Sequence, residues 1–238
     1  MAKRKLEKFE QIKTFSNVFE PEIKINLQTD FELKGNWKKN YFKNENPIVL
    51  ELGCGKGEYS VGLAIKYPEK NFIGIDIKGA RIWRGAKTAL EQKLNNVIFI
   101  RTKIDLINSF FSENEVDEIW ITFPDPQPTK QKKRLSSAYF LNFYQKILKN
   151  NGLVHLKTDS RLLHFYTLKL LNNNSITPLV STDNLYNSEY HNEILGIKTH
   201  YEQIFVNQGK NITYLKFLLK KDIEIIDIEK YTENDVPK

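Results

Sequence analysis

The chain has 238 residues and a formal charge of +7, from 36 Lys and Arg against 29 Asp and Glu, and 40% of its residues are hydrophobic. This composition suits one α/β domain with appendages, and it excludes a membrane-spanning class, because no apolar run approaches the ~18 residues that a span requires. The single cysteine, Cys54, excludes an intrachain disulfide and a thiolate metal cluster, so we expect a reducing, cytoplasmic setting and no metal.

The positive charge lies before residue 222. The segment 222–238 holds six acidic residues and two lysines, which leaves 34 basic and 23 acidic residues, or +11, on 1–221. Clustered lysines and arginines gain free energy from phosphate contacts and counterion release. The charge therefore indicates a polyanionic partner such as a nucleic acid, although general solubility would explain it too.

Three regions are predicted along the chain. A basic, aromatic-rich N-terminal arm (1–46) precedes the main domain (47–221), and an acidic C-terminal tail (222–238) follows it. We expect the arm to dock on the domain through its aromatic side chains. The alternative is an arm whose basic residues touch RNA.

Within the main domain, apolar runs of strand length alternate with helical patterns. Strands are predicted at 48–52, 71–76, 97–101, 116–123, 152–159, near 177–181 and at 212–219. Helices are predicted at 58–67, 80–94, 105–111, 136–148 and 161–171, with a basic loop at 124–135 and a polar loop to about 201. This alternation predicts a mostly parallel sheet with helices on both faces, which binds ligands at the carboxyl ends of its strands.

The stretch IVLELGCGKG, residues 48–57, is a buried strand that opens into a glycine loop and then a helix, the local shape of a nucleotide-type cofactor site. A dinucleotide site normally has the spacing GxGxxG, but Gly53, Gly55 and Gly57 are spaced GxGxG. Glu51 would also repel a diphosphate at this position. S-adenosylmethionine fits better, because it has no phosphate and its ammonium and sulfonium groups both favour a carboxylate.

Asp76 ends the second predicted strand, 21 residues after Gly55. A carboxylate at this position can accept hydrogen bonds from both ribose hydroxyls of an adenosine, or it can simply cap the next turn. Together with Glu51 and the three glycines, it predicts a methyltransferase-type site. Cys54 lies inside the cofactor loop, where a small side chain is needed, so we interpret it as a packing residue rather than a nucleophile.

The loop TFPDPQPTKQKKRL, residues 122–135, follows the fourth predicted strand and so opens at the same edge as the glycine loop. Its three prolines restrict the backbone and should hold Asp125 in one place over the cofactor. Four positive charges follow at Lys130, Lys132, Lys133 and Arg134. Such a cluster can position phosphates while the carboxylate reads a base edge. The alternative interpretation is a solvated turn.

With these motifs the sequence resembles the bacterial tRNA (guanine-N7)-methyltransferase family, which methylates a guanine in the variable loop. The matching stretches are ELGCGKGEYSVGLA, FIGIDIKGAR, TFPDPQP with KKRL, HLKTDS and GIKTHYEQ, across most of residues 47–205. The resemblance implies a Rossmann-like class I methyltransferase fold with an antiparallel final strand, S-adenosylmethionine as the methyl donor and tRNA as the partner.

The resemblance also implies roles for residues of this chain. Cofactor binding falls to Glu51, Gly53, Gly55, Gly57 and Asp76. Asp125 of FPDP takes the central active-site role beside the cofactor. Substrate binding falls to Asp159, Thr199 and Glu202.

At two positions this chain departs from the family pattern. The family's acidic residue after strand three, which approaches the adenine, aligns with Lys103, and Asp105 follows two residues later, so the residue at the adenine stays open between them. FPDPWPKK has become FPDPQPTK, which puts Gln127 in place of the aromatic and Thr129 in place of the first substrate lysine. Lys130 is expected to take over that lysine's role.

In the implied reaction, guanine N7 attacks the donor methyl group with a free lone pair, so no strong base is required. The enzyme must position the reactants, and Asp125 can stabilise the positive charge on the guanine or accept hydrogen bonds from its N1 and 2-amino groups. One alternative is a methyltransferase for another substrate, which would not need the basic loop. Another is an RNA-binding protein with a vestigial cofactor site. The oligomeric state, monomer or homodimer, stays open.

Overall fold

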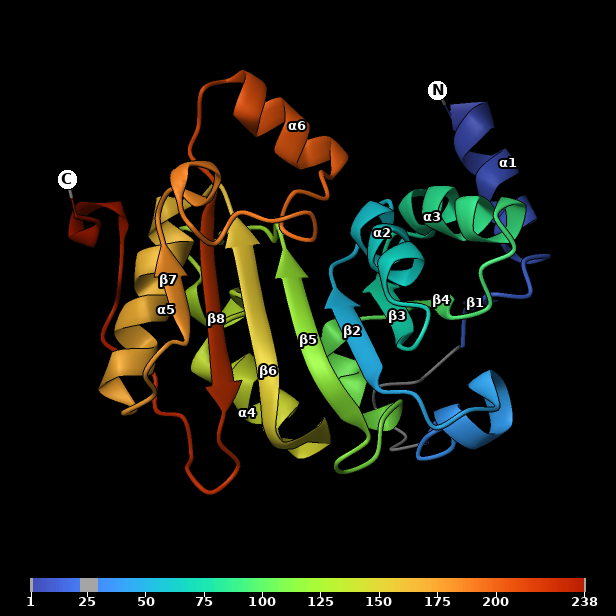
Figure 1. Ribbon diagram of the computed structural model, residues 1–238, viewed down its shortest axis with the longest axis horizontal. Helices are drawn as coiled ribbons and strands as arrows, with labels where there is room; N and C mark the ends of the chain where they lie inside the picture. Colours follow the sequence, from blue (N-terminus) through green and yellow to red (C-terminus); the bar gives the residue numbers. More distant parts are fainter. Residues whose placement is uncertain (1, 22–29, 238) are drawn as a thin grey trace.

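The computed structural model describes residues 2–21 and 30–237, which build one eight-stranded sheet in the order β1-β4-β3-β2-β5-β6-β8-β7 (Figure 1). The strands are β1 (Val18–Phe19), β2 (Ile48–Leu52), β3 (Asn71–Asp76), β4 (Val97–Arg101), β5 (Val116–Thr122), β6 (Leu148–Thr158), β7 (Val180–Thr182) and β8 (Thr213–Leu219). Every pair from β1 to β6 is parallel, whereas β8 runs antiparallel to both β6 and β7. The predicted mostly parallel sheet with an antiparallel final strand is confirmed.

Helices cover both faces of this sheet, as the sequence predicted (Figure 1). The α-helices are α1 (Ala2–Ile12), α2 (Glu58–Lys66), α3 (Gly79–Glu91), α4 (Ala138–Ile147), α5 (Arg161–Asn173) and α6 (His200–Asn207). Shorter helical turns are η1 (Trp37–Phe42), η2 (Ile104–Ser109), η3 (Gln131–Lys133), η4 (Leu185–Asn187) and η5 (Glu233–Asp235). Several elements were not predicted, among them α1 and the edge strand β1 in the arm, and α6, which begins where a polar loop was expected.

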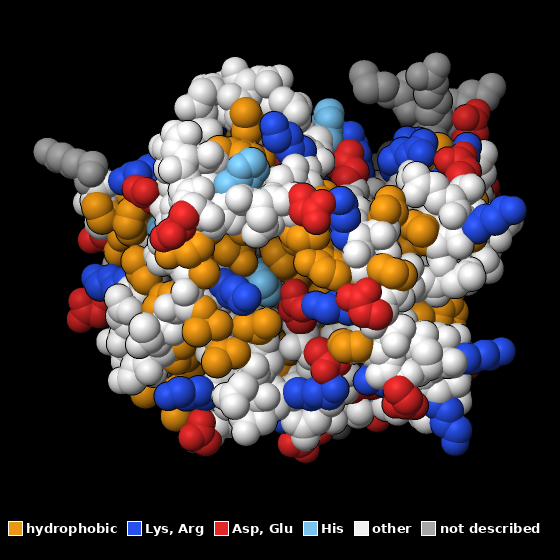
Figure 2. Space-filling view, viewed as in Figure 1, with side chains coloured by type: hydrophobic (Ala, Val, Ile, Leu, Met, Phe, Trp, Pro, Cys, Tyr) orange, Lys and Arg blue, Asp and Glu red, His pale blue; other side chains and the backbone are white. Residues whose placement is uncertain are grey.

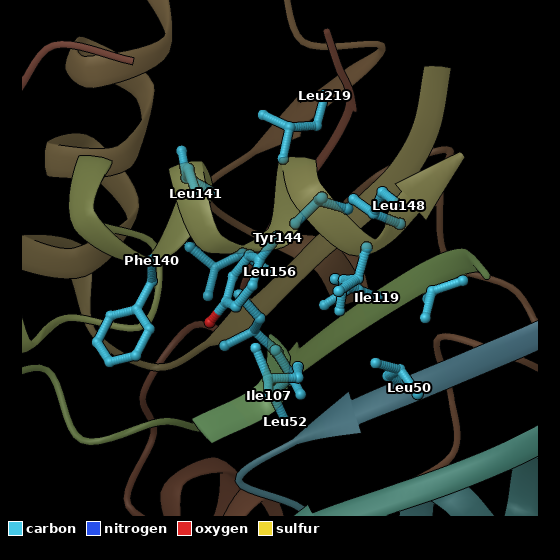
Figure 3. Close-up of a cluster of buried hydrophobic side chains, with 14 of the residues drawn as sticks. Leu50, Leu52, Ile107, Ile119, Phe140, Leu141, Tyr144, Leu148, Leu156 and Leu219 are labelled. Atoms are coloured by element: carbon cyan, nitrogen blue, oxygen red, sulfur yellow. The ribbon is translucent and has the colours of Figure 1, made fainter. Parts of the chain in front are cut away.

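One half of the core lies between the sheet and helices α4 and α5 (Figure 3). Leu141 and Tyr144 of α4 are buried against strand residues such as Leu50 and Ile119, because they recur at helical spacing on the face turned to the sheet. The other half lies between the opposite face and α2 and α3. All five residues of β2 are buried, since this central strand has neighbours on both sides and both faces covered.

The N-terminal arm is docked by its aromatic side chains. Trp37 is fully buried and its Nε1 donates a hydrogen bond to the carbonyl of Phe110 at 2.8 Å. Phe19 meets Trp37 edge to face, with ring centroids 5.6 Å apart. The described part of the arm thus packs as an extension of the core rather than as a free basic segment.

In Figure 1 the segment 185–198 crosses in front of the sheet near the carboxyl ends of β5 and β6, and Figure 2 shows hydrophobic side chains gathered on this same side of the molecule. Beneath this segment, His155 stacks on Trp120 with ring centroids 3.8 Å apart, and the two contribute to a 220 Å³ hollow. Burial lowers the pKa of His155 below its ordinary value. The ring is 4% exposed and its Nδ1 lies 2.7 Å from the Tyr214 hydroxyl, so His155 is a hydrogen-bonded residue of the core.

Candidate active site

The glycine loop after β2 has a left-handed backbone at each glycine. The φ angles are +74° at Gly53, +56° at Gly55 and +67° at Gly57, a region that favours residues without a Cβ. A Cβ on Gly57 would lie 2.4 Å from a ring carbon of Phe99, so the absence of a side chain at this position lets the start of α2 pack closely against Phe99 of β4. A Cβ on Gly55 would meet nothing closer than 4.0 Å, so the loop leaves room for a ligand there.

Asp76, at the end of β3, has a structural contact on each carboxylate oxygen. Its Oδ2 accepts a hydrogen bond from the Gly55 amide at 2.9 Å, and its Oδ1 accepts one from the Lys78 amide at 2.7 Å. The carboxylate therefore holds the glycine loop and caps the turn into α3. It also lines the cavity described below, so it stays within reach of a ligand.

Glu51 lies beneath the glycine loop and is only 3% exposed. Its carboxylate accepts hydrogen bonds from the Ser60 amide at 2.9 Å, from the Ser60 hydroxyl and from the Thr122 hydroxyl at 2.5 Å. Burial, with a smaller contribution from the charge of the neighbouring Asp76, raises the pKa of Glu51 to about 7, although the three hydrogen bonds act in the opposite direction. Glu51 is therefore a carboxyl group that changes charge near neutral pH.

A cavity of 610 Å³ opens at the carboxyl ends of the central strands, between the glycine loop and the loop after β5. This volume falls in the range of a small-molecule site. The predicted site residues that line it are Gly53, Asp76, Lys103 and Asp125, together with Asp105. Because Lys103 and Asp105 both line it, the geometry leaves the adenine contact open between them.

Other residues line the same cavity without having been singled out in the sequence. Arg81 enters from the first turn of α3, and Tyr139, which is 44% exposed, enters from the first turn of α4. Both follow a strand end by one loop, and Arg81 also ends the matching stretch FIGIDIKGAR, so the sequence held a second signal for Arg81 and only its position for Tyr139. The predicted substrate residues Thr129, Lys130, Asp159, Thr199 and Glu202 lie outside the lining.

Asp125 is exposed in the loop after β5, and two unusual backbone positions flank it. Phe123 and Gln127 have φ angles of +48° and +46°, which cost a side-chain-bearing residue about 1–3 kcal/mol each. The Asp125 Oδ1 accepts a hydrogen bond from the Gln127 amide at 3.0 Å. The direction of the carboxylate thus depends on a backbone conformation that its surroundings must maintain.

The basic cluster in this loop is smaller than the sequence suggested. Lys130, Lys132 and Lys133 are exposed, but Arg134 is fully buried and its guanidinium donates to backbone carbonyls. The expectation that Arg134 contacts phosphates with its neighbours is therefore wrong. A run of basic residues in the sequence does not show that the folded loop brings several backbone carbonyls within hydrogen-bonding distance of the Arg134 guanidinium.

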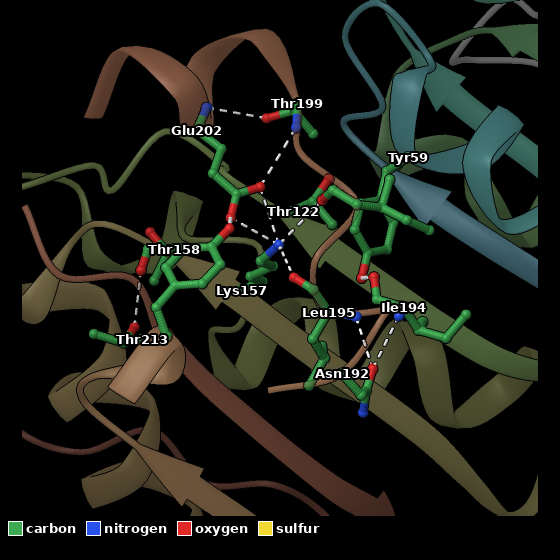
Figure 4. Close-up of polar contacts among 12 residues, drawn as sticks. Tyr59, Thr122, Lys157, Thr158, Asn192, Ile194, Leu195, Thr199, Glu202 and Thr213 are labelled. Carbon is green, nitrogen blue, oxygen red and sulfur yellow. Dashed lines mark hydrogen bonds and ion pairs between the residues drawn. The ribbon is translucent and has the colours of Figure 1, made fainter. Parts of the chain in front are cut away.

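A buried ion pair ties α6 to the end of β6 (Figure 4). Lys157 and Glu202 are both 0% exposed, and their charged atoms are 2.8 Å apart. Lys157 also donates to the carbonyl of Leu195 at 2.6 Å, and the Tyr186 hydroxyl donates to Glu202 at 2.5 Å. Thr199 and Glu202 form a capping box at the start of α6. Glu202 is thus engaged inside the protein rather than presented on its surface.

Asp159 follows β6 and pairs with Lys210 at 2.7 Å, with its side chain 14% exposed. It lies one strand further from the glycine loop than Asp125 does, because β6 neighbours β5 in the sheet. A ligand large enough to contact both the cavity and Asp159 would therefore have to pass over the loop that carries Asp125.

A glycine loop, an acid on the next strand and a carboxylate-bearing loop surround one cavity on a mostly parallel sheet, and together they define a class I S-adenosylmethionine-dependent methyltransferase. Solved structures support this fold. The 16S rRNA methyltransferase KamB aligns with a TM-score of 0.60 at 12% identity, over 76% of this chain and 92% of that one. An antibiotic-related methyltransferase aligns with a TM-score of 0.58 at 17% identity, over 80% and 96%.

Sequence comparison gives the particular family. A family model described as "Putative methyltransferase" matches residues 45–215. The tRNA (guanine-N(7)-)-methyltransferase of Christiangramia forsetii is 54% identical over 92% of this chain and 99% of its own length. That of Bacteroides fragilis is 49% identical over 94% and 89%. The chain belongs to the tRNA (guanine-N7)-methyltransferase family, as its motifs suggested.

No helix among residues 2–21 and 30–237 is long and apolar enough to cross a membrane. Within the same described residues, no group of three or more His, Cys, Asp or Glu side chains could hold a metal ion.

Proposed function

We propose that this protein transfers a methyl group from S-adenosylmethionine to N7 of a guanine in the variable loop of tRNA. The proposal rests on one observation: Gly53, Asp76 and Asp125 line the same cavity. The exposed lysines Lys130, Lys132 and Lys133 belong to the loop beside it. The names of its relatives point to the same reaction. Within this proposal, residues 47–221 form the methyltransferase domain, and the reaction takes place in the cytoplasm.

The residues of the cavity fit S-adenosylmethionine. Asp76 offers carboxylate oxygens for the ribose, the glycine loop leaves space above Gly55, and Lys103 and Asp105 both line the cavity, where either is available to the adenine. Glu51 supplies negative charge from beneath the loop. When bound, S-adenosylmethionine supplies a methyl group on a positively charged sulfur.

Asp125 is the proposed catalytic residue, because it is an exposed carboxylate on the cavity wall. Guanine N7 has a free lone pair, so the protein need not remove a proton before attack. Asp125 would stabilise the positive charge that develops on the guanine, or accept hydrogen bonds from its N1 and 2-amino groups. The exposed ring of Tyr139 offers an aromatic surface on which a purine can stack.

The remaining proposed substrate residues lie outside the cavity lining, in the segments that follow β5 and β6 and at the start of α6. Thr129 and Lys130 are exposed on the basic loop and suit phosphate contacts. Asp159 is partly exposed after β6, and Thr199 begins α6. Glu202 is buried, so its proposed part is to hold Thr199 and α6 in place.

The proposed function is tested by incubating the protein with labelled S-adenosylmethionine and unmodified tRNA, followed by aniline cleavage at N7-methylguanine. We expect label in the tRNA and cleavage at one guanine of the variable loop. Label without aniline-sensitive sites would identify a methyltransferase for another position. Binding of S-adenosylmethionine by calorimetry without any label transfer would favour the vestigial cofactor site.

The affinity for S-adenosylmethionine should fall as the pH drops below about 7, by up to about tenfold per pH unit. The pKa of Glu51 is about 7 in the folded protein, so the ionised form that attracts a cation grows as the pH rises through this value. Calorimetry between pH 6 and 8 should also detect proton release on binding. Glu51→Gln removes the ionisation, so an identical pH dependence in that variant would contradict the assignment.

Replacing Lys130, Lys132 and Lys133 with glutamine should weaken tRNA binding and flatten its salt dependence. Each phosphate contact contributes about 0.7–0.9 to the slope of log K against log salt, so the slope should fall by about 2–3. The matched control replaces three exposed lysines at the opposite edge of the sheet: Lys39, Lys43 and Lys220. Equal slopes for the two triple variants would mean that the loop is only a solvated turn.

A further inference from the structure

Arg134 is a buried arginine whose hydrogen bonds converge on the active-site loop. Its Nε donates to the carbonyls of Pro126 at 3.2 Å and Gln127 at 3.4 Å, and its Nη2 donates to that of Pro128 at 3.3 Å. The same Nη2 donates to the carbonyl of Tyr231 at 3.0 Å. One guanidinium therefore joins three successive loop residues to the C-terminal segment, which the forked, planar shape of arginine permits.

The C-terminal segment is fixed to the same loop at a second point. The side-chain nitrogen of Gln131 donates to Asp227 at 3.1 Å and to the carbonyl of Ile228 at 3.0 Å, and its oxygen accepts from the Tyr231 amide at 2.8 Å. The Tyr166 hydroxyl of α5 also donates to Asp227 at 2.9 Å. Tyr231 itself is buried. Residues 227–231 of the acidic C-terminal tail are thus held against the loop at Gln131 as well as at Arg134.

The carbonyls that Arg134 holds begin one residue after Asp125. Asp125 takes its orientation from the Gln127 amide, and Gln127 has a left-handed backbone that a side-chain-bearing residue rarely adopts. Prolines restrict φ on either side of Gln127, but they do not select this conformation at Gln127 itself. Contacts from residues after Pro128 must select it, and Arg134 supplies three of them, at the carbonyls of Pro126, Gln127 and Pro128.

We propose that Arg134 and the C-terminal segment 227–231 form a clasp that fixes Asp125 in its working position. Arg134 is then a positioning residue, and the C-terminal segment is a part of the active-site support. The inference rests on the proposed function for its kinetic readout, because that function makes Asp125 the catalytic residue. Its structural readout, the order of residues 123–130, does not depend on the reaction.

Two variants open the clasp from different sides. Arg134→Lys keeps the positive charge but has one nitrogen in place of Nε and Nη2, which lie apart on the guanidinium and bind different carbonyls, and Gln131→Leu removes the second attachment while leaving Arg134 intact. The matched control is Arg161→Lys, because Arg161 also binds a C-terminal carbonyl, that of Pro237 at 2.8 Å, but its hydrogen bonds within the described chain, to Asp183 and Pro237, include none to the loop. Each variant is compared with the wild-type chain by methyl transfer to tRNA, calorimetry with S-adenosylmethionine, and hydrogen exchange.

We expect Arg134→Lys and Gln131→Leu to lower kcat at least tenfold, with the Kd for S-adenosylmethionine within twofold of wild type. Amides of residues 123–130 should exchange at least tenfold faster in both, whereas Arg161→Lys should match wild type throughout. Unchanged exchange in both clasp variants would overturn the proposal. So would a raised KM for tRNA with unchanged kcat and a flatter salt dependence, because that pattern assigns Arg134 to a phosphate. If the wild-type chain forms no N7-methylguanine, the proposed function fails, and the exchange comparison still decides the clasp.

Discussion

Replacing Asp125 with asparagine is expected to lower kcat for tRNA methylation by about 10²–10³-fold, the usual effect of removing one electrostatic group from a transition state. Asparagine keeps the size of the side chain and can still accept the Gln127 hydrogen bond, so the loop should keep its shape. What it loses is the negative charge opposite the developing positive charge on the guanine. Single-turnover kinetics with saturating tRNA would measure the methyl-transfer step directly.

The affinity of this variant for S-adenosylmethionine should stay within a few-fold of wild type, since Asp76, Glu51 and the glycine loop are unchanged. The control is Glu113→Gln, an exposed acid at the opposite edge of the sheet, which should leave both quantities unaltered. A normal kcat in Asp125→Asn would remove the carboxylate from the mechanism. A large loss of cofactor affinity would instead assign Asp125 to the donor site.

The central part of the fold was predictable because local pattern and tertiary environment agree there. β2 is an apolar run with strand neighbours on both sides, and the glycines after it have the left-handed backbone that their residue type favours. The strand bounds of β2, β3 and β4 match the predicted ones for this reason. Gly53, Asp76 and Asp125 then meet at one cavity, because parallel strands bring their carboxyl ends to one edge.

What could not be predicted depends on contacts between distant parts of the chain. Helix α6 has only eight residues, and Glu202 on it pairs with Lys157 from β6, so tertiary contacts hold it in place. Its capping box, Thr199 with Glu202 three residues later, was the local signal available in the sequence. Arg134 was misjudged for a similar reason, since a run of basic residues does not show which member turns inward.

The buried pair between Lys157 and Glu202 leads to the largest expected effect on stability. Lys157→Met should lower the free energy of unfolding by about 3–5 kcal/mol, because it leaves the Glu202 carboxylate buried without its countercharge. Burial already lowers the pKa of Lys157, and Glu202 is what favours its charged form. Urea unfolding followed by circular dichroism would measure the change.

The double variant Lys157→Met with Glu202→Gln tests whether the lost stability comes from the unpaired charge of Glu202 or from the other hydrogen bonds of the lysine. Glutamine can accept from the Thr199 amide with its one oxygen, and its nitrogen can donate to the oxygen of the Tyr186 hydroxyl, but it carries no charge. Most of the lost stability should therefore return in the double variant. If the double variant is no more stable than Lys157→Met, the loss comes from the bonds of Lys157 to the carbonyls of Leu195 and Ile197. In that case Lys157 stabilises the protein by holding the segment before α6 against β6, and the charge of Glu202 is incidental.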